Sequence, residues 1–221
     1  ASGVYMGRLL NPSGDKVPPE ELYDACRVMA KYVDWKGELS WDFNALHEGL
    51  IDPEFDRLID SYLSDVMVNS AAHKGWKIPA TTLIYPWVAR KFPYAKYIHW
   101  IRDPRDSITG PHNTDDLSRF GVAYPETQNE RERRAISWFY QYEIMKATPR
   151  PKQRIVVRFE DFVMKQEETL CRLEDFLGIS LGRIVVREES IGRYKQDSEQ
   201  TYFDFFKEAM GAHEYDTIDG A

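Results

Sequence analysis

Apolar residues in the first third of the chain recur at intervals of three and four, the spacing that places them on one face of an α-helix. One such helix opens after Val17-Pro18-Pro19 and carries Leu22, Ala25, Met29 and Val33. A second opens at Asp52-Pro53, where aspartate can cap the helix and proline can take its first position. Its apolar face would consist of Phe55, Leu58, Ile59, Tyr62, Leu63 and Val66. The apolar segment 3–7 lies between glycines and is typical of a buried strand or its end.

From residue 75 onward, short apolar runs alternate with helical stretches. The runs GWKI (75–78), YIHWI (97–101) and RIVVRF (154–159) predict strands, of which 97–101 is expected to be buried. The pattern predicts helices over about 81–92 and 128–147, one ending at Gly178 and a last one over 202–209, with a long surface loop over 110–127. Strands separated by helices predict an α/β fold with three layers, a parallel sheet with helices on both faces. Ligands of such sheets bind beyond the carboxyl ends of the strands.

Composition narrows the class of protein. The chain has 221 residues, 43% of them hydrophobic and 14% aromatic, which is enough for one core and predicts a single domain over 1–221. No apolar run approaches the ~20 residues of a membrane span. The net charge of −7 argues against nucleic acid as a partner. Cys26 and Cys171 form neither a disulfide framework nor a metal site; we expect both to be buried in a protein of the reducing cytoplasm.

The segment FPYAKYIHWIRDPRDSITG (92–110) carries the most chemical information. Arg102 follows the predicted strand, Asp103 can cap the next helix, and Asp106 lies in its first turn. Free peptide N–H groups beside a guanidinium suit a phosphate monoester, and Ser107 and Thr109 add hydroxyl donors. Spacing alone leaves an alternative open, in which Arg102 and Asp106 merely pair and cap a helix.

At this segment the sequence resembles the sulfotransferases that use 3′-phosphoadenosine 5′-phosphosulfate (PAPS). Their motif for the 3′-phosphate reads FPxAKxIxxxRDPRD, and residues 92–106 match it. Four further segments resemble the family in the right order: the K-x-P segment at 77–79, a YEDL-like strand end at 157–162, an FLG helix end at 176–178 and a G-R-W-K-like loop at 192–195. The resemblance therefore covers residues 75–195 and implies a fold like that of the phosphate-loop (P-loop) nucleotide-binding proteins.

The resemblance also implies roles for individual residues. Arg102, Arg193 and Lys195 would contact the 3′-phosphate of PAPS or of its product adenosine 3′,5′-bisphosphate (PAP), and Gly192 would let the backbone approach closely. Lys77 would lie near the transferred sulfuryl group.

One family position differs in this chain. Gly110 stands where relatives carry a serine that helps to bind the cofactor, so that role is vacant or passes to Ser107 or Thr109.

The catalytic base is identified less directly. Relatives use a histidine or glutamate near the K-x-P segment; the candidates here are His73, His99, His112 and Glu48. Side chains of a strand point alternately to its two faces, and His99 is expected to lie on the face that packs in the core. His112 follows the RDPRD segment in a loop and is taken as the catalytic candidate together with Lys77. The transfer requires fixed positive groups around the developing charge and no metal.

Several other features have simpler explanations. The cluster Arg131–Arg134 is expected on a solvated helix face with charge pairs three and four residues apart. Glu160 and Asp161 at a strand end are expected to cap and to make structural hydrogen bonds. Segments 35–50 and 110–128 are expected to line the pocket for a small-molecule or carbohydrate acceptor.

No phosphate loop of RSGTS type precedes the matched segments, and the early glycines are Gly3, Gly7 and Gly14. We therefore expect the chain to be N-terminally incomplete, lacking the first strand and the loop that holds the phosphosulfate. The alternative function is a non-catalytic remnant that binds nucleotide or a protein partner, with an unpaired sheet edge that could drive homo-oligomerisation. A kinase-like enzyme is disfavoured because no G-x-x-x-x-G-K-[ST] motif is present.

Overall fold

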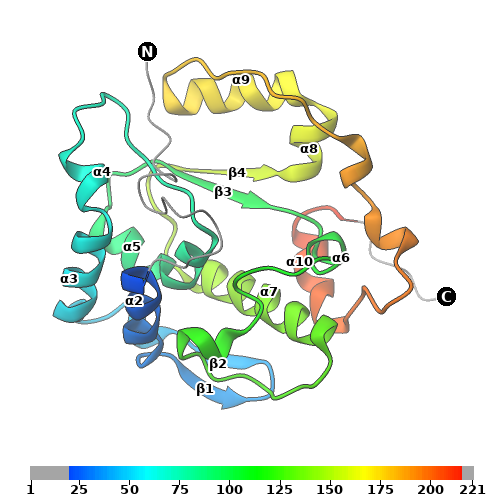
Figure 1. Cartoon of the computed structure of the whole chain (residues 1–221), viewed down its shortest axis with the longest axis horizontal. Coiled ribbons are helices and arrows are strands. Elements are labelled where there is room, and N and C mark those ends of the chain that lie inside the picture. Colours follow the sequence, from blue (N-terminus) through cyan, green and yellow to red (C-terminus); the bar gives the residue numbers. More distant parts are fainter. Residues whose placement is uncertain (1–19, 216–221) are drawn as a thin grey trace. The chain divides into compact units, whose positions relative to one another are not determined.

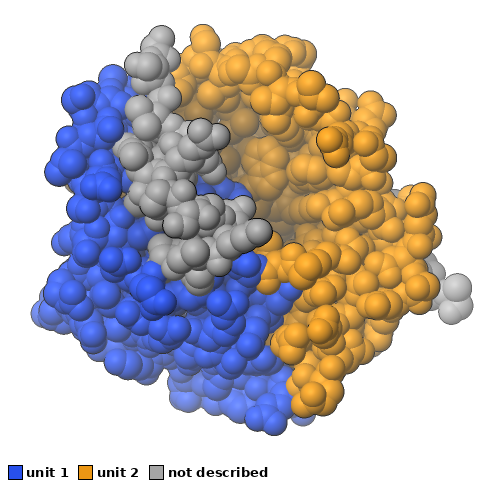
Figure 2. Space-filling model, viewed as in Figure 1, with its two compact units in different colours: residues 1–91, 113–126, 143–149 blue, residues 92–112, 127–142, 150–221 orange. Residues whose placement is uncertain are grey.

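The computed structural model describes residues 20–215, which divide into two compact units (Figures 1 and 2). Within these bounds, unit 1 comprises 20–91, 113–126 and 143–149, and unit 2 comprises 92–112, 127–142 and 150–215. The strand predicted at 3–7 and the prolines predicted to open the first helix lie outside the described residues. The rest of that helix is confirmed as α2 (Glu20–Ala30).

Unit 1 has a helical core. The predicted helix after Asp52 is confirmed but breaks at Leu63 into α3 (Pro53–Tyr62) and α4 (Ser64–Val68). Asp52 caps it as expected, because its Oδ1 accepts a hydrogen bond from Glu54 N at 2.8 Å. The buried rings of Phe55 and Trp87 meet edge to face at 4.9 Å, and Trp87 Nε1 donates to the Leu46 carbonyl at 3.1 Å.

The segment 69–92 departs from the expectation. Residues 75–78 form no strand, and the next helix begins as a 3₁₀ helix, η2 (Pro79–Ile84), before it continues as α5 (Tyr85–Lys91). Gly75 and Lys77 are exposed, so the run lacks the buried side chains that a core strand requires. Pro86 has no N–H to donate to the carbonyl four residues earlier, which explains why the α-helix starts afresh at Tyr85.

A small hairpin in unit 1 was not predicted. Strands β1 (Asp34–Gly37) and β2 (Ser40–Asp42) pair antiparallel, with Gly37 at φ 95° in the turn, and the 3₁₀ helix η1 (Asn44–Leu46) follows. The strands are too short to show an alternating pattern. Trp41 Nε1 donates to the Ala123 carbonyl at 2.8 Å, beyond the 3₁₀ helix η3 (Leu117–Phe120). The segments predicted to line the acceptor pocket therefore meet at this bond.

Unit 2 is built on a parallel pair of strands. β3 (Tyr97–Ile101) pairs with β4 (Arg154–Arg158) in a register that runs from Tyr97 opposite Arg154 to Ile101 opposite Arg158. Figure 1 shows α8 (Phe159–Met164) and α9 (Gln166–Leu177) beside this pair. Gly178 at φ 75° ends α9, as predicted. Among residues 20–215, the sheets are two-stranded, so the parallel pairing is confirmed and the wider three-layer sheet stays a prediction.

The expectation that the strand over 97–101 is buried is wrong for most of its length. Ile101 is buried, whereas Ile98 and Trp100 are 42% and 43% exposed. The Trp100 ring meets the Phe162 ring edge to face at 5.1 Å, which covers only part of the indole. Apolar composition predicted the strand correctly but overestimated how much of it is covered.

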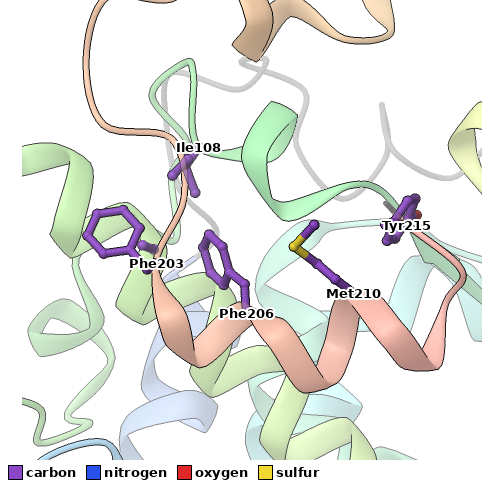
Figure 3. Packing of buried hydrophobic residues seen from close by; sticks show 6 residues of the cluster. Ile108, Phe203, Phe206, Met210 and Tyr215 are labelled. Atoms are coloured by element: carbon purple, nitrogen blue, oxygen red, sulfur yellow. The ribbon is translucent and has the colours of Figure 1, made fainter. Parts of the chain in front are cut away.

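Unit 2 has a hydrophobic core of its own, which lies along α7 (Glu130–Ala147) and the C-terminal helices (Figure 3). The last predicted helix is confirmed in two parts, the 3₁₀ helix η6 (Asp204–Phe206) and α10 (Lys207–Ala212). The buried members of this cluster are Ile108, Ala135, Phe203, Phe206, Met210 and Tyr215. Because Ile108 lies two residues after the RDPRD segment (102–106), this core anchors the end of that segment.

Two further expectations have clear outcomes. No helix within the described ranges is long and apolar enough to cross a lipid bilayer. Cys26 is buried and burial raises its pKa, but Cys171 is exposed, so the expectation of two buried cysteines is wrong for Cys171. Cys171 lies on α9 between the buried positions Leu170 and Leu173 and therefore faces outward.

Candidate functional site

The RDPRD segment folds into a single helical turn, α6 (Pro104–Ser107), directly after β3. Asp103 caps it as predicted, with Oδ1 accepting from Arg105 N at 2.9 Å. The amide of Asp103 donates to Glu160 Oε1 at 2.9 Å. The expectation of a helix-terminal amide open to an anion is therefore wrong for Arg105, whose N–H already donates to a carboxylate of the chain. The anion chemistry that can be traced at this site comes from side chains.

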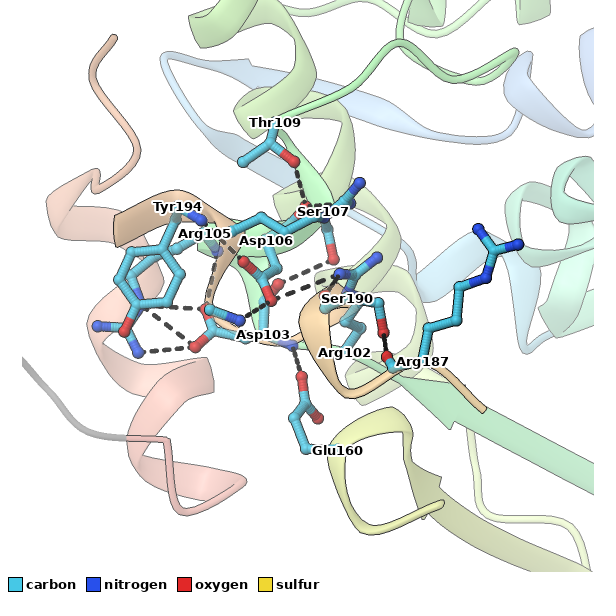
Figure 4. A network of polar contacts seen from close by, with 12 residues as sticks. Arg102, Asp103, Arg105, Asp106, Ser107, Thr109, Glu160, Arg187, Ser190 and Tyr194 are labelled. Carbon is cyan, nitrogen blue, oxygen red and sulfur yellow. Dashed lines mark hydrogen bonds and ion pairs between the residues drawn. The ribbon is translucent and has the colours of Figure 1, made fainter. Parts of the chain in front are cut away.

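Asp106 joins α6 to a loop far along the chain (Figure 4). Its side chain is 1% exposed and accepts from Gly192 N at 2.7 Å and from Tyr194 N at 3.0 Å. Arg102 NH2 also lies 3.4 Å from its Oδ2. The predicted pairing of Arg102 with Asp106 is thus present, but the larger role of this carboxylate is to dock residues 192–194. Their amide donors satisfy its buried charge.

Arg105 provides a second contact between the same two segments. Its guanidinium forms an ion pair with Asp103 at 2.7 Å and lies 4.2 Å from the centroid of the Tyr194 ring. The side chain is buried, so Arg105 supports the loop rather than facing a ligand.

Among the four arginines of residues 20–215 whose Nε is buried without a partner, Arg102 is the one in the RDPRD segment. Its guanidinium lies 4.6 Å from the centroid of the Phe159 ring, and NH2 donates to the Ser190 carbonyl and to Asp106. Its Nε is buried and has no hydrogen-bond partner among residues 20–215. A buried donor without a partner costs about 1–3 kcal/mol, and an anion acceptor at this position would remove that cost.

The loop after Gly192 brings two more cations to α6. Gly192 has φ 74°, a left-handed conformation that glycine adopts without strain, and the 3₁₀ helix η5 (Arg193–Gln196) follows. Arg193 is exposed, with NH2 3.4 Å from the Asp106 carbonyl oxygen, and Lys195 is exposed with Nζ 5.9 Å from the Tyr194 ring centroid. The structure therefore gathers Arg102, Gly192, Arg193 and Lys195 around one helical turn.

The two predicted hydroxyl donors are engaged in this structure. Ser107 Oγ donates to the Asp103 carbonyl and Thr109 Oγ1 donates to the Asp106 carbonyl, each at 2.9 Å. Both lie beside α6, but each hydroxyl must rotate before it can donate to a ligand.

The catalytic candidates lie in other segments. Lys77 is exposed in the irregular segment of unit 1 that precedes η2, and His112 is exposed at the end of the segment 92–112 of unit 2. Their predicted roles are not tested by any contact in the structure.

The other candidate bases differ in burial. His99 is half-buried rather than packed in the core, and Arg154 NH2 lies 2.7 Å from its Nδ1. Burial, Arg154 and His213 lower the pKa of His99 to about 3, so the ring is neutral at neutral pH. His73 and Glu48 are exposed.

Arg131 is a residue whose environment the sequence pattern did not predict. The expected charge pairs are confirmed for Arg133 and Arg134 with Glu130, at 3.9 and 3.3 Å, although the Arg134 side chain is only 15% exposed. The expected solvated face is wrong for Arg131, which is 5% exposed and pairs with Asp197 and Glu199. These partners lie 66 and 68 residues further on, a distance that no helical spacing reveals.

Glu160 has the structural role that was expected. Its second oxygen, Oε2, accepts from the Tyr215 hydroxyl at 3.0 Å while Oε1 accepts from Asp103 N. The carboxylate thus ties the start of α8 to the RDPRD segment and to the C-terminal end of the described chain.

Comparison with known proteins agrees with this arrangement. A family model described as "Sulfotransferase family" matches residues 15–182, well over half of the chain and including the RDPRD segment. The chain belongs to the sulfotransferase family. This sulfotransferase is 27% identical over 173 residues to a Caenorhabditis elegans protein named "Putative protein-tyrosine sulfotransferase". The match covers 74% of this chain and 63% of the nematode protein. No solved structure matches the sulfotransferase significantly.

The family match ends before the loop over 192–195, so that loop's assignment to the site rests on the contacts of Asp106. In the part of the sulfotransferase that the structure describes, no group of three or more His, Cys, Asp or Glu residues could hold a metal ion.

Proposed function

We propose that this sulfotransferase takes its sulfuryl group from PAPS and transfers it to a hydroxyl or amine acceptor, with the 3′-phosphate held at α6. The observation that carries the proposal is the buried Nε of Arg102, which has no hydrogen-bond partner among residues 20–215 and lies beside a loop that presents two exposed cations. A guanidinium donor with nearby Arg193 and Lys195 fits a dianionic phosphate monoester. The family membership supports the choice of donor.

Each residue of the site has a part in this proposal. Arg102 donates to the 3′-phosphate, while Arg193 and Lys195 neutralise its remaining charge from the loop side. Gly192 adopts without strain the left-handed conformation in which its amide donates to Asp106. Ser107 and Thr109 contribute less, since their hydroxyls first have to leave backbone carbonyls.

The chemistry that PAPS supplies is a sulfuryl group that passes in line from one oxygen to another, through a loose transition state. Lys77 would stabilise negative charge near the group that is transferred. His112 would accept the proton of the acceptor hydroxyl at a ring nitrogen. The assignment of Lys77 comes from the family resemblance and that of His112 from its position in the loop after the RDPRD segment; both are open to direct test by substitution.

A tyrosine hydroxyl is the acceptor that we favour within this proposal. The supporting observation is the similarity to the nematode protein named "Putative protein-tyrosine sulfotransferase", 63% of whose length is matched. The acceptor would lie near segments 35–50 and 110–128, which Trp41 joins through its bond to Ala123.

The proposal includes the wider fold. The β3–β4 pair would belong to a parallel sheet with helices on both faces, in one P-loop-like sulfotransferase domain over residues 1–221. The cytoplasmic location and homo-oligomerisation expected from the sequence stay predictions.

Calorimetric titration of the chain with PAP, with AMP as the nucleotide that lacks the 3′-phosphate, tests the function. PAP should bind in preference to AMP, and Arg102→Ala should weaken PAP binding at least tenfold. Arg172→Ala is the matched control, because this arginine is exposed on α9. Equal affinity for both nucleotides, or a loss that the control shares, would overturn the proposal.

A further inference from the structure

We propose that Arg131 is a positioning residue of the 3′-phosphate site, an assignment that rests on the proposed function. Arg131 does not face the cofactor. It binds the residues that follow, in sequence, the loop that carries Arg193 and Lys195. Without it, the residues that follow Lys195 would lose their link to the segment after α6.

The contacts of Arg131 use all three nitrogens of its guanidinium. Nε donates to Glu199 Oε2 at 3.0 Å, and NH2 donates to Glu199 Oε2 and Asp197 Oδ2, both at 2.9 Å. NH1 donates to the Ile108 carbonyl at 2.9 Å. With a side chain only 6% exposed, Arg131 has a fixed direction toward each partner.

The partners of Arg131 lie directly after the two segments that form the proposed phosphate site. Ile108 directly follows α6, and Asp197 directly follows η5. Asp106 on α6 already binds the start of the same loop through the amides of Gly192 and Tyr194. Asp106 binds the loop on both sides of Arg193, and Arg131 holds the chain that follows Lys195. If the contact of Arg131 were lost, the loop could move from Lys195 onward, beyond the Tyr194 amide that Asp106 still holds.

The ion pairs of Arg131 also affect the electrostatics of the proposed phosphate site. Asp197 and Glu199 lie two and four residues beyond Lys195, and Arg131 forms ion pairs with both. The Glu199 amide and the Arg131 guanidinium, against a smaller effect of burial, hold the pKa of Asp197 below its usual range. Removal of Arg131 would leave two carboxylates beside the cations that bind the phosphate, and so oppose binding of a dianion.

Arg131→Lys is the informative substitution. Lysine keeps the positive charge but cannot donate in three fixed directions from a planar group. Arg133→Lys on the same helix is the matched control, since Arg133 pairs with Glu130 at the helix surface at 3.9 Å. Glu199→Gln removes the charge of one partner of Arg131 and leaves Arg131 itself unchanged. The Glu199 side chain is 64% exposed, so this variant serves as the second one should Arg131→Lys fail to fold.

Two measurements on the full chain decide the matter. Hydrogen exchange of the ligand-free protein reports how firmly residues 192–199 are held, and calorimetry with PAP and AMP reports the phosphate site. We expect Arg131→Lys to speed exchange in 192–199 about tenfold and to weaken PAP about tenfold, which lowers the preference for PAP over AMP. Glu199→Gln should act in the same direction with a smaller change, and Arg133→Lys should alter neither.

The outcomes separate this assignment from the proposed function. Unchanged exchange in 192–199 overturns it, as does faster exchange with unaltered PAP affinity, which would make Arg131 a structural residue only. In both cases the wild-type chain still binds PAP, and the proposed function stands. A folded wild-type chain that shows no preference for PAP overturns the proposed function and the assignment together.

Discussion

The buried carboxylate of Asp106 accepts a hydrogen bond of 2.7 Å from the backbone amide of Gly192, a residue 86 positions further along the chain. Through this bond the single turn of α6 and the loop that follows Gly192 form one site. A carboxylate that is buried with amide donors on both oxygens holds its partners firmly, because any rearrangement leaves a charge without hydrogen bonds.

Asp106→Asn should therefore destabilise the protein by about 2–3 kcal/mol, the range for lost hydrogen bonds to a charged group. An asparagine presents an NH₂ group to one of the two amides that now donate to the carboxylate. Urea unfolding followed by circular dichroism measures the change, with Asp175→Asn on the exposed surface of α9 as the control. A loss no larger than that of the control would show that the bonds to Gly192 and Tyr194 contribute little.

Gly192→Ala tests the conformation of the loop. At φ 74° an alanine costs about 1–2 kcal/mol, and the added Cβ meets nothing closer than the Lys195 side chain at 3.7 Å. Gly178→Ala is a matched control, since its φ is 75° and a Cβ there meets nothing within 4 Å. Both variants should lose similar stability in thermal unfolding, but only Gly192→Ala should weaken PAP binding. If both variants weakened PAP binding equally, residue 192 would have no specific role in the phosphate site.

His99 predicts how stability depends on pH. Its pKa is about 3 in the folded protein against 6.5 in the unfolded chain, because of burial and the positive charges of Arg154 and His213. Between these values the unfolded state binds more protons, so this contribution is complete above pH 6.5 and is lost as the pH falls below it. At pH 5.5 the loss should be about 1 kcal/mol.

His99→Gln should remove that part of the pH dependence, whereas His73→Gln, at an exposed position, should retain it. Urea unfolding at pH 7.5 and pH 5.5 gives the comparison. A wild-type protein and a His99→Gln variant with equal losses over this interval would contradict the low pKa of His99.

Local signals predicted much of the fold. Asp52 and Asp103 act as helix caps and Gly178 ends a helix, because these functions depend on adjacent residues only. The pairing of β3 with β4 followed from two apolar runs separated by a helix. The run over 75–78 looked similar but forms no strand and is only half-buried at Trp76 and Ile78, and apolar composition alone does not distinguish the two cases.

The residues of the candidate site were predicted from the sequence, but the contacts that hold them together were not. The family resemblance named Arg102, Gly192, Arg193 and Lys195, and the structure shows them around α6. It did not indicate that Asp106 docks the loop, or that Arg131 holds it through Asp197 and Glu199. These contacts join residues 66 or more positions apart, and their side chains look like ordinary surface charges in the sequence.

The most direct test of the central claim is ³¹P nuclear magnetic resonance of PAP in the presence of the chain, because it observes the two phosphates separately. We predict that the 3′-phosphate resonance shifts and broadens, and that Arg102→Ala abolishes this change while Arg172→Ala preserves it. An unaltered 3′-phosphate resonance beside folded protein, or a change confined to the 5′-phosphate, would contradict the assignment of α6 as the 3′-phosphate site.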